Sequence, residues 1–118
     1  MKYHLVTLGC AKNTVDSMRL ERALRESVLT MREAAAVGAD LLRTGHQPAD
    51  PITLMLADRL GFAVWEEIPL YHATPLIFER TMDRGIPQQM VREMALRDMN
   101  RPSVLFHGFA NESGGDDE

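Results

Sequence analysis

The segment RPSVLFHGFANES, residues 101–113, decides the fold that this sequence predicts. Pro102 favours the end of a preceding helix. The apolar run at 103–106 is bounded by turn-forming residues and predicts a strand buried on both faces, as in a parallel sheet. Asn111 and Glu112 follow that strand directly. Catalytic residues of α/β barrels lie at the C-terminal ends of the strands, so Glu112 becomes a candidate catalytic carboxylate.

Outward from this strand, the chain alternates short apolar runs with longer helical patterns. Capping and proline signals predict the helix starts, and glycine or proline predicts their ends. We expect strands at residues 2–8, 39–44, 62–65 and 103–106, and helices from Thr14 or Asp16 to Gly38, from Asp50-Pro51 to Gly61, from Thr74-Pro75 to about Arg84, and from Pro87 to Asn100. This order favours a parallel sheet with right-handed crossovers.

The predicted fold class is therefore α/β, either a partial (β/α)₈ barrel with about four parallel strands and outer helices or a small open sheet. Three helices show apolar stripes at steps of three and four residues, which predict their buried faces. The expected stripes are Leu20, Leu24, Val28, Met31 and Ala35; Ile52, Met55, Leu56 and Leu60; and Met90, Val91 and Met94.

Every loop that follows a strand falls on the same edge of a parallel sheet. That edge collects Cys10, Arg43, His46, Glu66, Glu67, His72, Asn111 and Glu112. A zinc site made of His46, His72 and Glu112 is one alternative, although no ligand-spacing motif supports it, and we predict no metal. A strand end followed by a solvated acidic tail is the simpler interpretation of Asn111 and Glu112. Trp65 is expected in the core.

Composition excludes several classes of protein. The chain has 118 residues, which suits one small domain, and a net charge of -4 without a Lys/Arg run, which argues against nucleic-acid binding. Cys10 is the single cysteine, which excludes an internal disulfide and an all-cysteine metal site within one chain. No apolar stretch is long enough to span a membrane, and no signal peptide is visible. These observations predict a cytoplasmic protein without a membrane partner.

Three further segments carry a resemblance to a known family. They are MREAAAVGADLLRTGHQP at 31–48, LADRLGFAVWEEIP at 56–69, and VREMALRDMNRPSV at 91–104, which runs on to Asn111-Glu112-Ser113. From about residue 25 to 115, the chain resembles the barrel domain of glycoside hydrolase family 2, the β-galactosidase and β-glucuronidase family. Three motifs in the right order over about ninety residues are more specific than a lone Asn-Glu pair.

The resemblance implies roles for five residues. Glu112 matches the general acid/base, Asn111 the residue that hydrogen-bonds the sugar 2-hydroxyl, and His46 a histidine that lines the sugar pocket. Arg43 matches the strand-end arginine that supports the nucleophile, and Glu67 an acidic position after the third strand. Two structural alternatives stay open. Arg43 could simply pair with Glu66 or Glu67, and His46 could cap the helix that begins at Asp50.

The resemblance also exposes what these 118 residues lack. A retaining glycosidase needs two carboxyl groups about 5–5.5 Å apart, and the family's nucleophile is a glutamate from a late barrel strand. We therefore expect the isolated chain to be inactive. His107 stands where many members carry tryptophan. Tyr71 stands where magnesium-binding β-galactosidases carry a glutamate, which argues against that metal site and agrees with the prediction of no cofactor.

Residues 5–17, LVTLGCAKNTVDS, resemble a second family, the radical-SAM methylthiotransferases. There Cys10 would be the first of three cluster ligands, but one thiolate cannot hold a [4Fe–4S] cluster. The predicted organisation is a methylthiotransferase-like start at 1–24 joined to the N-terminal half of a glycoside hydrolase barrel at 25–118, as one structural unit.

Three functional hypotheses follow. The first is a family 2 glycoside hydrolase fragment that binds carbohydrate and takes part in hydrolysis of O-glycosyl bonds in the complete protein. The second is a methylthiotransferase remnant that binds iron or RNA. The third is a non-enzymatic half-barrel that self-associates through its exposed sheet edges.

Overall fold

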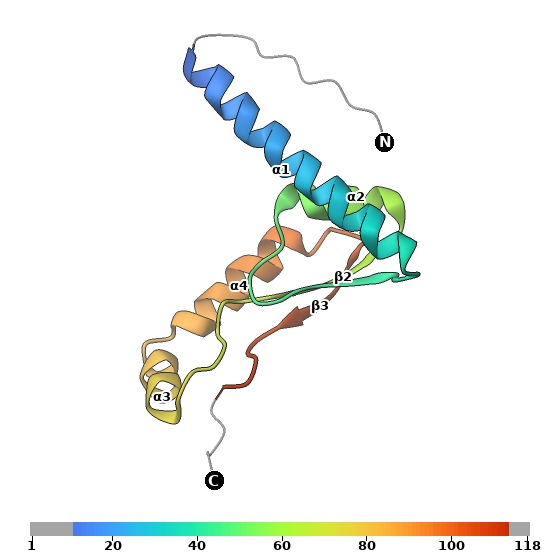
Figure 1. Ribbon diagram of the computed structural model, residues 1–118. Coiled ribbons are helices and arrows are strands. Elements are labelled where there is room, and N and C mark those ends of the chain that lie inside the picture. The colour runs from blue at the N-terminus through green and yellow to red at the C-terminus, as the bar shows by residue number, and fades with distance from the viewer. Residues whose placement is uncertain (1–10, 114–118) are drawn as a thin grey trace.

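The structure is a computed structural model that describes residues 11–113. The elements, in chain order, are α1 (Ala11–Ala36), β1 (Leu41–Thr44), α2 (Pro51–Leu60), β2 (Ala63–Glu67), α3 (Pro75–Asp83), α4 (Ile86–Asp98) and β3 (Val104–Gly108). Figure 1 shows α1 projecting well beyond the rest of the molecule. The expected alternation of strands and helices is confirmed from residue 39 onward, and the strand expected at 2–8 lies outside the described residues.

The three strands of the described region form one parallel sheet in the order β1-β2-β3. Leu42 pairs with Val64, and Trp65 pairs with Phe106 after a bulge in the second ladder. Parallel pairing places the C-terminal ends of all three strands at one edge. The predicted α/β class with a parallel sheet is therefore confirmed, with three strands in the described residues.

The helix-start signals are confirmed where proline follows a capping residue. Asp50 accepts a hydrogen bond of 2.8 Å from the Ile52 backbone N–H, and Thr74 accepts one of 3.4 Å from Ile77. Each cap satisfies a donor that the first helical turn leaves unpaired. Gly61 ends α2 with a φ of 80°, a left-handed conformation that glycine adopts without steric cost.

The first helix begins before its expected start at Thr14 or Asp16, where Asp16 was the expected N-cap. α1 begins at Ala11, so Asp16 lies inside the helix. Aspartate costs a helix interior little compared with proline or glycine, so it cannot by itself enforce a start.

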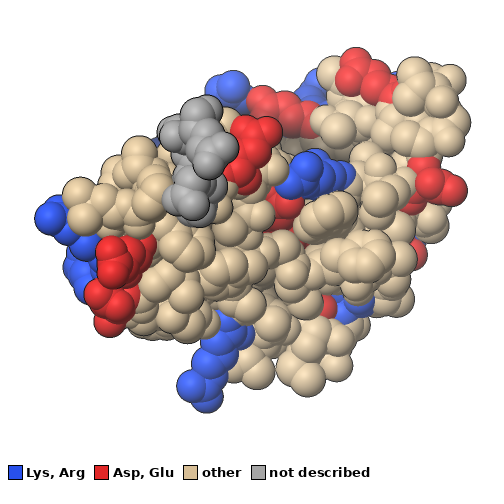
Figure 2. Space-filling view, turned by 90° about the horizontal axis from the view of Figure 1, so that it is seen from below, with Lys and Arg blue, Asp and Glu red and all other residues tan. Residues whose placement is uncertain are grey.

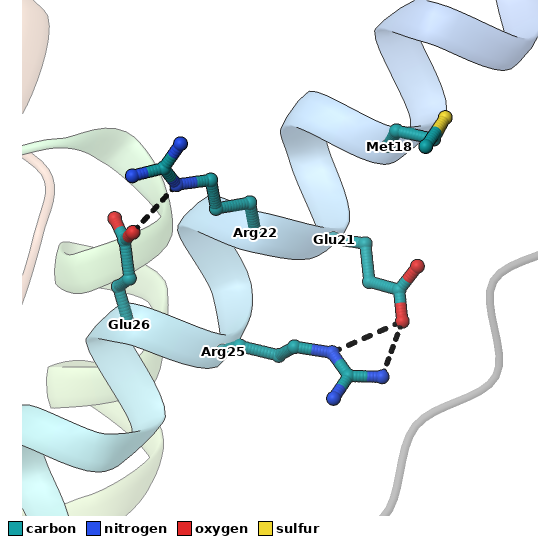
Figure 3. A pocket seen from close by; sticks show the side chains of 5 residues that line it. All are labelled: Met18, Glu21, Arg22, Arg25 and Glu26. Carbon is teal, nitrogen blue, oxygen red and sulfur yellow. Dashed lines mark hydrogen bonds and ion pairs between the residues drawn. The ribbon is translucent and has the colours of Figure 1, made fainter.

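The exposed side of α1 carries two ion pairs spaced by one helical turn. Arg22 lies 2.8 Å from Glu26 and Arg25 lies 2.7 Å from Glu21. Figure 3 shows both pairs on the helix. Pairs at this spacing support a helix locally, without tertiary contacts. They contribute to the helical conformation of α1 where it leaves the core.

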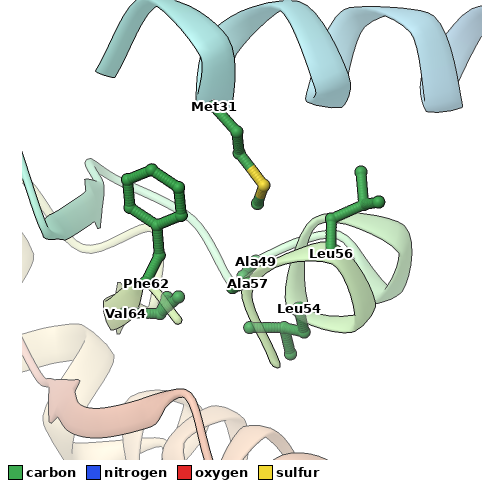
Figure 4. Packing of buried hydrophobic residues seen from close by; sticks show 7 residues of the cluster. All are labelled: Met31, Ala49, Leu54, Leu56, Ala57, Phe62 and Val64. Atoms are coloured by element: carbon green, nitrogen blue, oxygen red, sulfur yellow. The ribbon is translucent and has the colours of Figure 1, made fainter. Parts of the chain in front are cut away.

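The main core lies between α1, α2 and the sheet. Met31 points from α1 toward the residues of α2 and β2 (Figure 4). The buried cluster is Met31, Ala49, Leu54, Leu56, Ala57, Phe62 and Val64, with Leu24, Val28 and Ala34 packed against it. The predicted stripe of α1 is thus confirmed in its middle, whereas Leu20 is 46% exposed and Ala35 is exposed.

The predicted face of α2 is partly wrong. Leu56 is buried as expected, but Leu60 is 47% exposed, and the fully buried residues include Leu54 and Ala57 instead. Because α2 is packed between α1 and β2, its buried surface is wider than one stripe. In α4 the prediction is confirmed, because Met94 is buried and Met90 and Val91 pack beside it in a second cluster with Ile68 and Leu70.

The strand in the deciding segment is shifted and more exposed than expected. β3 runs from Val104 to Gly108, with Leu105 59% exposed and Phe106 53% exposed. Within the described residues, β3 pairs with β2 alone and is an edge strand. The prediction of burial on both faces is therefore wrong for this strand, because no described element covers its second side.

The two faces of the sheet have different roles. Successive side chains of a strand point to opposite faces. Val64 packs in the core with α1 and α2, and Glu66 contacts Arg97 of α4, so the helices cover one face. Trp65 and Glu67 belong to the opposite face, where a closed barrel has its interior.

Candidate active site

Arg43 links the ends of all three strands. Its Nε donates a hydrogen bond of 2.7 Å to Glu67 Oε1, and its Nη2 lies 2.7 Å from the same oxygen. Nη2 also donates a bond of 2.8 Å to Asn111 Oδ1. Arg43 belongs to β1, Glu67 to β2, and Asn111 follows β3. One guanidinium thus joins the three segments at the C-terminal edge of the sheet.

Glu67 is buried and fully engaged. Its side chain is 2% exposed, Oε1 accepts from Arg43, and Oε2 lies 2.6 Å from His46 Nδ1. Burial by itself would raise the pKa of Glu67, but the hydrogen bonds from His46 and Arg43 outweigh it and hold that pKa below its usual range. Glu67 is therefore a fixed carboxylate near neutral pH.

Glu67 is the last residue of β2 rather than part of a following loop. The predicted end of the strand at Trp65 is wrong, because both glutamates find partners on neighbouring elements and continue the ladder. Strand alternation then sends Glu66 and Glu67 to opposite faces, which separates two carboxylates that sequence places side by side.

Trp65 and Gly108 pack against Arg43 and Glu67. The Arg43 guanidinium carbon lies 4.7 Å from the centre of the Trp65 ring, an arrangement that favours cation–π attraction. A Cβ added at Gly108 would lie 2.6 Å from Glu67 Cγ and 2.7 Å from Trp65 Nε1, so glycine permits this close approach. Trp65 is half-buried and packs against Phe106, on the sheet face opposite the helices.

His46 contacts Glu67 and Tyr71. Its ring stacks on that of Tyr71, with centroids 5.2 Å apart. The alternative in which His46 caps the helix at Asp50 is wrong, because Asp50 supplies its own cap and His46 is held by Glu67. The alternative in which Arg43 pairs with Glu67 is confirmed, and that pairing is compatible with a further role at this edge.

Glu112 lies at the same edge, beside His72. The His72 Nδ1 to Glu112 Oε2 distance is 3.2 Å, and the two side chains are 65% and 69% exposed. The loops after β2 and β3 hold these residues together through a short parallel bridge between Tyr71 and Asn111. His72 N–H donates to Asn111 O at 3.1 Å, and Asn111 N–H donates to Leu70 O at 2.9 Å.

The structure therefore joins Arg43, His46, Glu67 and Asn111 through hydrogen bonds, and Glu112 follows Asn111 in the chain with its side chain beside His72. It also places Tyr71 and His72 there; the sequence had assigned His72 to this edge and to the zinc alternative only, and had given Tyr71 no contact within the site. The available signal was their position in the loop that follows β2, at the edge where Asn111 and Glu112 also lie. Cys10 lies outside the described residues.

Glu66 belongs to a separate buried cluster behind the sheet. Its fully buried carboxylate lies 3.0 Å from His107 Nδ1 and 3.4 Å from Arg97 Nη2. Burial raises the pKa of Glu66, and the nearby Asp98 adds to this, against the lowering effect of Ala49 N–H, His107 and Arg97. This cluster ties α4 to β2 and β3 and does not open to the candidate site.

The described part of the chain can be searched for metal sites, membrane-spanning helices and basic surface patches. Within residues 11–113, no group of three or more His, Cys, Asp or Glu side chains could hold a metal ion, so the zinc alternative finds no support there. No helix in that range is long and apolar enough to cross a membrane. On the face shown in Figure 2, acidic and basic side chains are scattered over a mainly uncharged surface rather than gathered in a basic patch.

A family model described as the TIM barrel domain of glycosyl hydrolases family 2 matches residues 20–118. Two curated β-galactosidases are also similar to the chain. The protein of Thermoanaerobacterium thermosulfurigenes is 35% identical over 79 residues, which cover 66% of this chain and 10% of that protein. That of Bacteroides ovatus is 29% identical over an alignment covering 95% of this chain and 12% of that protein.

Solved structures give the same result. The β-glucuronidase of Bifidobacterium dentium, complexed with coumarin-3-O-glucuronide, superposes with a TM-score of 0.69 at 26% identity, over 76% of this chain and 15% of that one. A β-galacturonidase of Eisenbergiella tayi bound to galacturonate superposes with a TM-score of 0.63 at 29% identity, over 82% and 17%. The chain thus spans less than a fifth of the length of these proteins.

Proposed function

Because this chain belongs to family 2 of the glycosyl hydrolases, as part of their TIM barrel domain, we propose that its strand ends form the proton-donating side of a β-glycosidase active site. The relatives are named as β-galactosidases, a β-glucuronidase and a β-galacturonidase. The substrate proposed here is correspondingly a β-glycoside, and the reaction is hydrolysis of its O-glycosyl bond by the complete protein.

In this proposal Glu112 is the general acid/base. Its carboxyl group protonates the glycosidic oxygen as the bond breaks and later takes a proton from the attacking water. Asn111 places its amide beside the sugar 2-hydroxyl, because Arg43 holds the Oδ1 end and leaves the Nδ2 donor available. His46 contributes a wall of the sugar pocket.

One observation carries the proposal, namely the bridge that Arg43 makes between Glu67 and Asn111. It fixes the segment that bears Glu112 against the ends of β1 and β2. Catalytic groups need positions accurate to a fraction of an ångström, and such fixing supplies them. A strand end that simply continued into a solvated tail would not require this hydrogen bond between Asn111 and a partly buried ion pair.

Glu67 is proposed as a positioning residue rather than the nucleophile. Its two oxygens already accept from Arg43 and His46, and its low pKa keeps it charged and bonded. The second carboxylate of a retaining mechanism would therefore come from another part of a longer protein or from a partner chain.

We predict that the 118-residue chain alone does not hydrolyse aryl β-galactosides or β-glucuronides. General acid/base catalysis by itself contributes about 10²–10⁴-fold, whereas enzymatic enhancements start at about 10⁶-fold. Release of the aryl group should be measured for the wild type and for Glu112→Gln, purified identically so that contaminating glycosidase shows equally in both.

Hydrolysis that Glu112→Gln abolishes would show that a second carboxylate completes the site within the chain or between copies. The prediction of an inactive isolated chain would then be wrong, although the role of Glu112 would be supported. Sugar binding supplies the test of the role itself. Saturation-transfer NMR with galactose, glucuronate and galacturonate should show binding that Asn111→Ala weakens. Binding unchanged by that substitution would contradict the proposed site.

A second proposal, self-association, is favoured by the exposed apolar edge of β3. Leu105 and Phe106 are each more than half exposed there. Apolar side chains on an open strand edge favour pairing with another chain. We propose that a second copy of this chain covers this edge when no other segment does.

Phe106→Lys should therefore weaken self-association at least about tenfold, since burying one large apolar side chain contributes about 1.5–3 kcal/mol. Sedimentation velocity over a range of concentrations measures the effect. Leu76→Lys on α3 is the matched control, because Leu76 is 54% exposed and lies away from the sheet edge. A wild type that is monomeric at every concentration would exclude the proposal.

The likeness of residues 1–24 to methylthiotransferases stays a prediction, together with the domain boundary near residue 24 and the cytoplasmic location. The alignment with the Bacteroides ovatus β-galactosidase over 95% of this chain favours a single glycosidase origin instead.

A further inference from the structure

We infer that His72 is a positioning residue for Glu112, holding one of its two carboxylate oxygens. This inference rests on the proposed function, in which Glu112 is the general acid/base. The observation behind it is the 3.2 Å separation of His72 Nδ1 and Glu112 Oε2.

The backbone keeps the two side chains adjacent. His72 N–H and Asn111 O share a hydrogen bond of 3.1 Å, and Ala73 N–H donates to Ser113 Oγ at 3.1 Å. Ser113 Oγ in turn donates to Asn111 O at 3.0 Å. The loop that carries His72 and the loop that carries Glu112 are thus joined on both sides of the pair. Both residues adopt a positive φ, 49° for His72 and 45° for Glu112.

Ring contacts also connect His72 to His46 and Glu67, the buried part of the candidate site. Tyr71 meets His72 edge-on, with ring centroids 5.8 Å apart, and stacks on His46 at 5.2 Å. His46 is bonded to Glu67. A row of three aromatic rings therefore runs from the buried carboxylate of Glu67 to the exposed carboxylate of Glu112.

The chemistry of the contact determines where the proton lies. The 3.2 Å separation is an ion-pair distance. A carboxylate accepts hydrogen bonds and cannot donate them, so in the inferred contact the proton that faces Oε2 is carried by Nδ1 of His72. Oε2 of Glu112 is then occupied, and Oε1 is the oxygen that carries the proton delivered to the glycosidic oxygen. A neutral His72 held in this way has its single proton on Nδ1 and not on Nε2.

Long-range ¹H–¹⁵N NMR of the 118-residue chain tests this at about pH 9, above the ordinary imidazole pKa of about 6.5. We expect the His72 resonance, assigned by its loss in His72→Gln, to show a protonated Nδ1. Glu112→Ala should abolish that signature and leave His46 and His107 unchanged, because their Nδ1 atoms face Glu67 and Glu66. Glu79→Ala, on an exposed part of α3, is the control and should change none of them.

A His72 signature that is unprotonated at Nδ1 in the wild type, or that survives Glu112→Ala, would overturn the inference. The outcome is separate from that of the sugar-binding test. Loss of the signature in Glu112→Ala without any sugar binding would refute the proposed function and leave the contact established. Sugar binding with an unchanged signature would refute the positioning role alone.

Discussion

Leu54→Ala is expected to lower the free energy of unfolding by about 2–5 kcal/mol. Leu54 is completely buried in the cluster that joins α1, α2 and the sheet. Removing its three outer carbons loses their transfer free energy and leaves a cavity that the packed neighbours fill incompletely. Urea denaturation followed by circular dichroism measures the change, provided that the slope of the transition stays constant.

Leu76→Ala is the matched control. Leu76 is 54% exposed in the first turn of α3, so the same change of side chain should shift stability by no more than about 0.5 kcal/mol. Similar losses in the two variants would mean that the core is not where the structure places it. Leu54 is a good test of the packing in the structure for two reasons. It is fully buried, and the apolar stripe predicted from the sequence did not include it.

Local signals in the sequence predicted the element order well. Asp50-Pro51 and Thr74-Pro75 start helices because a side-chain acceptor and a fixed φ act within one turn and need no distant partner. Gly61 ends α2 for a similarly local reason. The alternation of strands and helices also predicted parallel pairing. A helix between two strands of one sheet carries the chain back across the sheet, so that both strands run in the same direction.

Burial was predicted less well, because it depends on what lies across from a residue. Leu60 fits the helical stripe of α2 but extends beyond the neighbouring elements, whereas Leu54 lies against them. Phe106 looks like a core residue in its strand and is half exposed, because no described element covers the sheet face to which it belongs. Apolar periodicity identifies which face of a helix or strand is apolar, but it does not identify which element packs on that face.

In the candidate site too, local sequence signals were predictive and contacts between distant segments were not. Strand ends predicted which residues share an edge, and the structure places Arg43, Glu67 and Asn111 in direct contact there. The different environments of Glu66 and Glu67 follow from one residue of alternation along β2, but their partners come from α4 and β1, far away in sequence. The contact of His72 with Glu112 depends on two loop conformations that no pattern encodes.

Arg43→Met should destabilise the chain by up to about 3 kcal/mol at neutral pH. Removing one partner of a buried ion pair typically costs about 3–5 kcal/mol because the other charge stays buried. The lower figure applies because the Arg43 side chain is 43% exposed and partly screened by water, and because His46 still bonds Glu67. Arg92→Met, at an exposed position of α4, is the control and should change stability by less than about 0.5 kcal/mol.

The dependence on pH distinguishes this effect from a loss of packing. The pKa of Glu67 is lowered in the folded chain, so its ion pairs contribute stability above the ordinary value of 4.5, and that contribution is lost as the pH falls through the folded pKa. In Arg43→Met the ionised form of Glu67 has lost one of its partners, so ionisation of Glu67 contributes less to stability at every pH. The stability difference between wild type and Arg43→Met should therefore be largest near pH 7 and should shrink below pH 4.5. Urea titrations at pH 3, 5 and 7 measure it, and a difference that stays constant over this range would show that Arg43 acts through its contact with the Trp65 ring rather than through its charge on Glu67.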